Sequence, residues 1–181
     1  MAKVNSFISD VEAIRQRARE NIEKGAVTDS YEIDREAVIN LCNQALATEI
    51  VCVLRYKRHY FMATGIHADP VAKEFLAHAN QEQMHADKLA ERITQLGGEP
   101  DLNPAGLAAK SHTEYVEGDS LVDMVTEDLV AERIVVDIYR EAIRFLGDND
   151  PTTRRIIEDI LADEEEHASD LAKILAAMNP S

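Results

Sequence analysis

The chain has 181 residues, of which 45% are hydrophobic and 29% charged, and its formal net charge is −15 at pH 7. This length and composition are typical of one globular domain with a buried core and exclude a largely disordered chain. The acidic balance disfavours a surface that binds the phosphate backbone of nucleic acids and favours a surface that attracts cations.

Residues 1–33 predict a helical extension that precedes the main domain. Ser6 or Ser9 could cap a helix that ends near Lys24 and Gly25, and the polar link AVTDSYE follows. The segment lacks the apolar centre of a signal peptide, and no apolar run of the chain approaches the roughly 20 residues of a membrane span. We therefore expect no membrane association.

Caps and helix breakers divide residues 34–178 into four long helical segments. The expected helices span 34–64, 69–96, 120–146 and 151–178. Asp34 and Ser120 are the expected N-caps of the first and third, and Asp-Pro pairs open the second and fourth. About 22 residues without a helical pattern separate the second helix from the third, which is long enough for a crossover. The expected fold is all-α, a four-helix bundle with one long crossover and an N-terminal helical extension.

Two cysteines lie ten residues apart on the first of these helices. Cys42 and Cys52 are thus about 15 Å apart along the helix axis and cannot form a disulfide with each other. Reduced thiols fit a cytoplasmic location. Cys42 lies seven residues before Glu49, so we expect a buried structural thiol there.

The two halves of the bundle repeat one pattern. The first half contains ATEIVCVLRY and then EQMH, and the second contains VAERIVVDIY and then EEEH. In each half a second glutamate follows the first by 33 or 32 residues and is itself followed, three residues later, by a histidine. One Glu-x-x-His pair alone is better explained as a solvated or structural pair, but two matched copies predict a shared site. The candidate ligands are Glu49, Glu82, His85, Glu132, Glu164 and His167.

All four candidate glutamates lie near the middle of their expected helices. Because neighbouring helix axes are about 8–10 Å apart, inward carboxylates at one height converge on a common centre. Four such carboxylates in an apolar core would repel one another and lose their hydration, which two divalent metal ions would compensate. Protonation of some glutamates is the other route to compensation. Carboxylate and imidazole ligands together suit iron or manganese, so the pattern predicts a dinuclear metal site.

The stretches EQMHADKLAERITQLGG and EDILADEEEHASDLAKIL resemble bacterioferritin, and the resemblance covers roughly residues 38–175. It implies a ferritin-like fold in which the six candidates are ferroxidase ligands for two iron ions per subunit, with two of the glutamates bridging the ions. Manganese or zinc could take the place of iron in a crystal. The resemblance further implies oxidation of Fe(II) by O2 or H2O2 and storage of ferric mineral inside a hollow homo-oligomeric shell. Tyr56 occupies the position of a tyrosine near that di-iron site.

Three features depart from bacterioferritin. Gln83 stands where that family has its haem-binding methionine, and Met84 lies about 100° further round the helix, which puts haem binding in doubt. Only 14 residues follow His167, too few for a short fifth helix, and some 33 residues precede the bundle. The last two features resemble Dps-like relatives with a bacterioferritin-type site, and they favour a shell of twelve subunits over one of twenty-four. The cluster RQRAR at 15–19 could touch DNA, but acidic residues flank it, so nucleic-acid binding is not expected.

Other polar residues have two interpretations each. Asp128, one turn before Glu132, could accept the free N–H of a ligand histidine, most plausibly His167, or face the helix surface. Tyr56 and Tyr139 could supply an electron or a hydrogen bond, or be ordinary core tyrosines. His78 could lie where metal enters, although a satisfied core or surface histidine is the simpler explanation. The remaining histidines are expected on the surface or in loops, at His59, His67 and His112.

Three other functions, from other classes of protein, compete with iron oxidation and storage. A rubrerythrin-like peroxidase shares the bundle but normally carries a CxxC pair, which is absent here. A di-iron oxygenase or manganese catalase would keep the ligands without storing mineral. A DNA-compacting, Dps-like protection protein is the third rival.

Overall fold

The computed structural model describes residues 10–66 and 68–178. Within them the chain is all-helical, as predicted, and contains no strand. The elements, in chain order, are α1 (Val11–Arg17), the short 3-10 helix η1 (Ile22–Lys24), α2 (Arg35–Met62), α3 (Ala68–Gln95), α4 (Pro104–Lys110), α5 (Leu121–Leu146) and α6 (Pro151–Met178).

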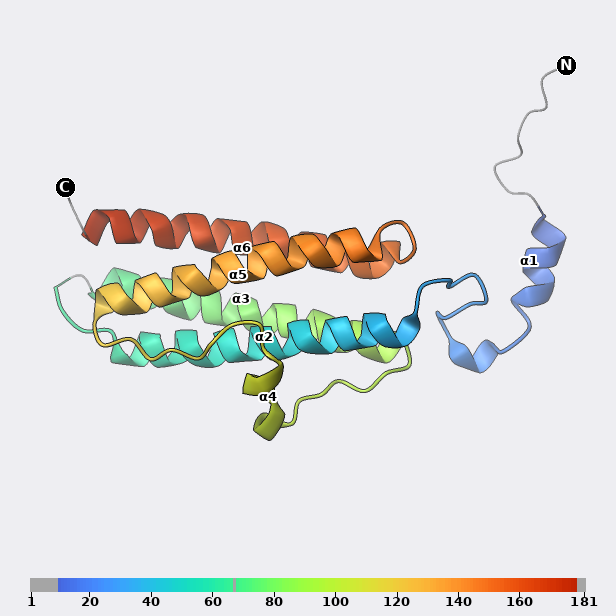
Figure 1. Ribbon diagram of the computed structural model, residues 1–181, viewed down its shortest axis with the longest axis horizontal. Coiled ribbons are helices and arrows are strands. Elements are labelled where there is room, and N and C mark those ends of the chain that lie inside the picture. The colour runs from blue at the N-terminus through green and yellow to red at the C-terminus, as the bar shows by residue number, and fades with distance from the viewer. Residues whose placement is uncertain (1–9, 67, 179–181) are drawn as a thin grey trace, which may run out of the picture.

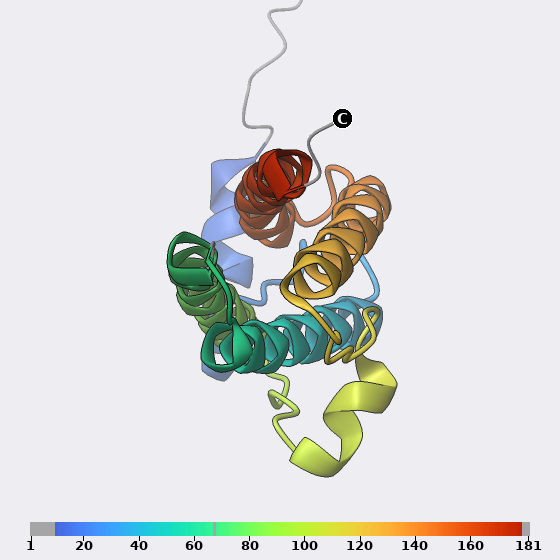
Figure 2. The ribbon, with the colours of Figure 1, turned by 90° about the vertical axis from the view of Figure 1, so that its left-hand side faces the viewer.

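The four long helices form a bundle made of two hairpins (Figure 1). Helix α2 packs along α3 and helix α5 along α6, while α2 also contacts α5 and α3 contacts α6. Seen along the bundle, the four helices surround one shared interior (Figure 2). The crossover between α3 and α5 runs along the outside of the bundle and carries α4, which packs on α2. The predicted four-helix bundle with one long crossover is confirmed.

The ends of the long helices lie within two residues of the predicted ones. The Asp34 side chain accepts hydrogen bonds from the backbone of the first turn of α2, and that of Ser120 accepts one from the first turn of α5. Asp150 caps α6, because its Oδ1 accepts from Thr153 N at 2.9 Å. Asp69 differs from the prediction, since it lies inside the first turn of α3 rather than before it.

The N-terminal extension differs from the predicted single helix. Helix α1 begins after Asp10, whose Oδ1 accepts from Ala13 N, and it ends at Arg17 instead of near Lys24. It buries none of its residues, so no tertiary packing supports a longer helix, and short helices alone are marginal in water. The proposed caps Ser6 and Ser9 lie outside the described residues. The division of the chain into units 1–33 and 34–178 stays a prediction.

The crossover was predicted to have no helix, but it contains α4. Asn103 caps this helix by accepting from Ala105 N at 3.1 Å, and Pro104 occupies its first position. Leu107 is the buried residue of α4 and packs against Ala47 and Val51 of α2. One large apolar residue among small ones shows no helical periodicity, which is why the sequence pattern failed to reveal this helix.

Helix α2 is more apolar than we expected from the sequence. It contains an 18-residue window with a mean hydropathy of 1.6, and its length and composition would suffice for a membrane span. In the bundle 61% of that window is buried, because α2 contacts α3, α5 and α4 on different sides. Burial in the core therefore accounts for the apolar character of α2. Both of its cysteines, Cys42 and Cys52, are buried and unpaired.

Candidate metal centre

The bundle brings together all six side chains that the repeated pattern singled out. One comes from α2, one from α5, and a Glu-x-x-His pair comes from each of α3 and α6; none exposes more than 2% of its surface. Their ligand atoms form two groups, and within each group these atoms all lie within 4.8 Å of one another. The first group is Glu49, Glu82, His85 and Glu164, and the second is Glu82, Glu132, Glu164 and His167.

The two groups overlap at Glu82 and Glu164. The His85 Nδ1 atom lies 3.2 Å from Glu82 Oε2 and 3.0 Å from Glu164 Oε1. The His167 Nδ1 atom lies 3.2 Å from Glu82 Oε1 and 3.5 Å from Glu164 Oε2. Each of these glutamates therefore turns one carboxylate oxygen toward each histidine, which is the geometry of a carboxylate that bridges two ions.

The remaining two glutamates each belong to one group. Glu49 Oε2 lies 3.5 Å from His85 Nδ1, and Glu132 Oε1 lies 3.9 Å from His167 Nδ1. Tyr139 on α5 donates a hydrogen bond to Glu49, and Tyr56 on α2 donates one to Glu132. Each tyrosine thus binds the terminal glutamate of the opposite hairpin, and both hydroxyls reach the site.

The donor set fits a pair of metal ions. Among the described residues, the buried side-chain polar atoms without a hydrogen-bond partner gather at this site, with Arg154 Nε as the exception. They are Glu82 Oε1, Glu132 Oε2, both carboxylate oxygens of Glu164, and His167 Nδ1. Leaving such atoms unpaired costs about 1–3 kcal/mol each, and more when they are charged, so a cation ligand removes a large penalty.

Protons are the alternative compensating charge. Burial, and then the neighbouring Glu164, raise the pKa of Glu49 and of Glu132 well above the usual carboxyl range. Burial lowers the pKa of His167, but the close carboxylates of Glu164 and Glu82 outweigh it and raise the pKa to about 9. The pKa of His85 is raised too, since the close carboxylates of Glu164, Glu49 and Glu82 outweigh its burial. Without cations the site would therefore hold several protons at neutral pH.

Two residues that the sequence analysis missed orient the histidines. The His85 Nε2 atom lies 3.0 Å from Asp163 Oδ2, and His167 Nε2 lies 3.1 Å from Gln81 Oε1. Both oxygens accept, so each Nε2 carries the proton and each Nδ1 is left free for a metal ion. Asp163 and Gln81 immediately precede the bridging glutamates, and the same offset in both halves is the signal that could have found them.

The expected partnership of Asp128 with His167 is wrong. Asp128 Oδ1 accepts from Arg55 Nε at 2.8 Å, and its Oδ2 lies 2.8 Å from His59 Nδ1. One turn of helix is about 5.4 Å, which moves Asp128 too far along the bundle from Glu132 to reach a ligand histidine. We name Arg55, His59 and Asp128 the crossover clamp, because the first two also bind backbone carbonyls of the crossover.

Three further histidines lie within the described residues. His59 is fully buried in the crossover clamp, so its expected surface position is wrong. His112 lies in the crossover, half-buried, with its Nδ1 3.1 Å from Thr48 Oγ1. His78 is a buried residue, and its ring stacks on that of His167 with 4.0 Å between centroids. His67 lies outside the described residues.

The sequence and the fold both match known proteins. Residues 39–179 match the profile of the ferritin-like domain. A "Nutrient stress-induced DNA-binding protein" from Nostoc is 32% identical over 138 residues, which cover 74% of each chain. A bacterioferritin from Desulfovibrio desulfuricans is 27% identical over 136 residues, covering 74% of this chain and 72% of that one.

Solved structures of similar proteins superpose on this fold. A Bacteroides fragilis protein described as a dodecameric thioferritin, related to bacterioferritin, superposes with a TM-score of 0.78 at 30% identity, covering 81% of this chain and 89% of that one. A Rhodobacter capsulatus bacterioferritin, described with a metal-free dinuclear site and haem iron, superposes with a TM-score of 0.70 at 26% identity, covering 78% and 85%.

Proposed function

The chain belongs to the ferritin-like family, and from this premise we propose that it is a ferroxidase that stores and detoxifies iron. It oxidises Fe(II) with O2 or H2O2 and keeps the ferric product as mineral inside a hollow homo-oligomer. The observation that supports this proposal most is the pair of four-ligand groups that share Glu82 and Glu164.

The proposed ligand set is nearly symmetric. Glu49 and His85 would hold one ion, Glu132 and His167 would hold the other, and Glu82 and Glu164, which belong to both groups, would be shared between them. Four carboxylates balance the charge of two divalent ions, and two neutral imidazoles complete the set. Bound Fe(II) supplies one electron per ion, so two electrons and two protons convert H2O2 into two molecules of water, or O2 into H2O2.

The surrounding side chains hold the ligands in place. The Tyr56 and Tyr139 hydroxyls donate to the terminal glutamates, which orients their carboxylates and stabilises their charge. Asp163 and Gln81 fix the protonated nitrogen of each histidine. Haem forms no part of the proposal, because the Gln83 amide offers no sulfur ligand and donates to Asp87 Oδ1 at 3.0 Å. Two buried, unpaired thiols fit the cytoplasm as the location, which stays a prediction.

An anaerobic Fe(II) titration followed by oxidant tests this function. We expect two Fe(II) ions per chain to be oxidised quickly, and further iron to co-elute with the protein on size exclusion as ferric mineral. The Glu164→Gln variant should lose the fast phase, because Glu164 belongs to both ligand groups. Glu166→Gln, an exposed position on the same helix, is the matched control and should behave like the wild type. Fast turnover without retained iron would instead indicate a peroxidase or catalase.

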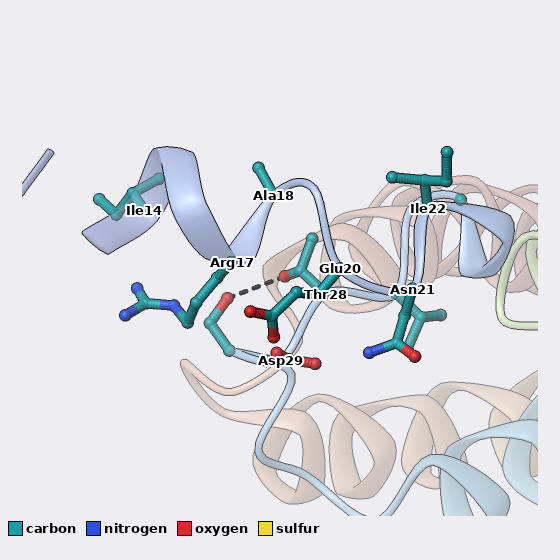
Figure 3. A pocket seen from close by; sticks show the side chains of 11 residues that line it. Ile14, Arg17, Ala18, Glu20, Asn21, Ile22, Thr28 and Asp29 are labelled. Atoms are coloured by element: carbon teal, nitrogen blue, oxygen red, sulfur yellow. Dashed lines mark hydrogen bonds between the residues drawn. The ribbon is translucent and has the colours of Figure 1, made fainter. Parts of the chain in front are cut away.

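DNA binding is a second candidate function, favoured by the similarity to the nutrient stress-induced DNA-binding protein of Nostoc. The arginines of 15–19 lie on the N-terminal extension and are exposed. Arg17 lines a hollow of about 490 Å³ together with Glu20 and Asp29 (Figure 3). Acidic side chains thus share the surface with the arginine, which weakens its attraction for phosphate.

A further inference from the structure

The two halves of the centre differ in the helix turns that precede the shared glutamates Glu82 and Glu164. Four and eight residues before Glu82 stand His78 and Glu74, whereas the matching positions before Glu164 are both isoleucines. Of these, Ile160 is fully buried in the core. The α6 side of the centre therefore continues as apolar packing, whereas the α3 side continues with an imidazole and a carboxylate, two side-chain types that can bind a metal ion.

His78 has one ring nitrogen without a satisfying partner. Its Nδ1 lies 3.2 Å from the Tyr56 hydroxyl, whose single proton goes to Glu132 once that carboxylate is ionised, as it is when it holds a metal ion. The Nδ1 atom must therefore be the donor to the Tyr56 oxygen, which leaves a lone pair on Nε2. That Nε2 faces Glu74 Oε1 at 3.4 Å, so one acceptor points at another.

A cation between the two acceptors resolves this conflict. Donor atoms 3.4 Å apart can both bind one divalent ion at about 2.1 Å, the usual distance for nitrogen and oxygen ligands. His78 exposes only 4% of its side chain, whereas Glu74 exposes 36%, so these two side chains connect solvent with the interior. On the inner side, ligand atoms of His78, Glu132 and His167 lie within 4.8 Å of one another.

We propose that Glu74 and His78 bind a third divalent cation per chain and pass it to the ion position of Glu132 and His167. Glu74 takes the ion from solvent, and the His78 Nε2 atom holds it one ring away from His167, on which His78 stacks. The inference rests on the proposed function, because the cation delivered in the cell is its Fe(II) substrate. The two ion positions of the centre, which we call the pair, are then filled from the α3 side.

Zinc serves as the probe, because it binds the same ligand types and undergoes no redox chemistry. Crystals of the assembled, metal-stripped protein soaked in Zn²⁺ should show three anomalous peaks per chain, the third between His78 Nε2 and Glu74. In Glu74→Gln the third peak should vanish while the two at the pair remain. His78→Phe keeps a ring to stack on His167 and should lose the same peak. Glu91→Gln, an exposed glutamate further along α3, is the control that keeps all three.

The rate of zinc uptake gives an independent readout in solution. With a zinc indicator in a stopped-flow instrument, Glu74→Gln should fill the pair roughly tenfold more slowly than wild type, at unchanged final stoichiometry, because an attracting charge at the mouth of the path is gone. Two peaks in the wild type, or equal uptake rates, would overturn the relay and leave the proposed function intact. Absence of zinc from the pair itself would overturn both.

Discussion

Glu164 is the residue on which the centre depends most. Its two carboxylate oxygens are buried without a hydrogen-bond partner, and they face both histidines. It also contributes to the raised pKa of Glu49 and of Glu132, so its negative charge is costly to its neighbours when cations are absent. The same side chain should therefore destabilise the metal-free bundle and stabilise the metal-bound one.

Replacing Glu164 by Gln separates these two effects. The metal-free variant should melt at or above the wild-type temperature, because an amide of similar shape carries no charge. Zn²⁺ at a hundred times its dissociation constant should stabilise the wild type by about 2.7 kcal/mol, or roughly 5–11 °C for a chain of this size, and the variant hardly at all. Calorimetry of stripped and zinc-loaded protein measures both. A full zinc effect in Glu164→Gln would contradict the bridging role.

The titration of the site gives zinc binding a definite pH dependence. The folded-state pKa of His167 is raised from 6.5 to about 9, so its bound proton stabilises the metal-free fold fully below about pH 6.5, and this contribution is lost as pH rises through about 9. Zn²⁺ must displace that proton and those on Glu49 and Glu132. Affinity should therefore rise between pH 6 and 8, about tenfold per unit for each proton released.

Calorimetric titration in buffers of different ionisation enthalpy counts these protons. The measured heat should vary with the buffer, and more than one proton should leave as the pair fills. A heat that is independent of the buffer, with an affinity that is flat in pH, would show that the site is not protonated beforehand.

At the scale of elements, the crossover clamp ties the crossover to the bundle. Arg55 Nη1 donates to Glu114 O at 3.0 Å, and His59 Nε2 lies 3.1 Å from Val116 O. Asp128 on α5 holds both side chains, and all three members of the clamp are almost wholly buried. The crossover thus closes the bundle at a level next to the centre, one turn along from Glu132.

Breaking the clamp should cost more than breaking an exposed ion pair. Asp128→Asn leaves the Arg55 charge buried without its counter-charge, and we expect a loss of about 3–5 kcal/mol, or roughly 6–20 °C in melting temperature. The matched control is Glu117→Gln, which breaks the ion pair that the 64%-exposed Glu117 makes with Arg58; it should cost at most about 1 kcal/mol. Equal effects in thermal melts would show that the clamp contributes no more than a surface pair.

The helices and their mid-height carboxylates could be predicted, whereas their partners could not. Caps and breakers are local signals, and errors of two residues at the helix ends barely move a residue at the centre. The partners of His85 and Asp128 come from other helices, so they depend on how the helices rotate and shift against one another. The sequence alone carries no local signal for that, which is why Asp128 was misplaced. Asp163 did leave a signal, because it precedes Glu164 as Gln81 precedes Glu82, but that signal does not name its partner.

At the scale of the whole molecule, the proposed function requires assembly. Val130, Ile134 and Phe145 of α5 are exposed on the single chain, as expected for a surface that a neighbouring copy covers. The similar Bacteroides fragilis protein is described as dodecameric. Light scattering on the eluted protein should give about 242 kDa, which is twelve chains of 20.2 kDa, and a value near 485 kDa would indicate twenty-four instead.

The net charge of the assembled protein disfavours the rival function, DNA binding. Each chain carries −15, so a shell repels nucleic acid unless the N-terminal extension overcomes the repulsion locally. We expect no retarded DNA band at about 0.15 M salt, where charges further apart than about 8 Å are largely screened. Replacing Arg15, Arg17 and Arg19 by Ala should then change nothing, and Arg155→Ala on the bundle is the control. A retarded band that disappears both with added salt and with the triple substitution would establish the extension as a DNA-binding arm.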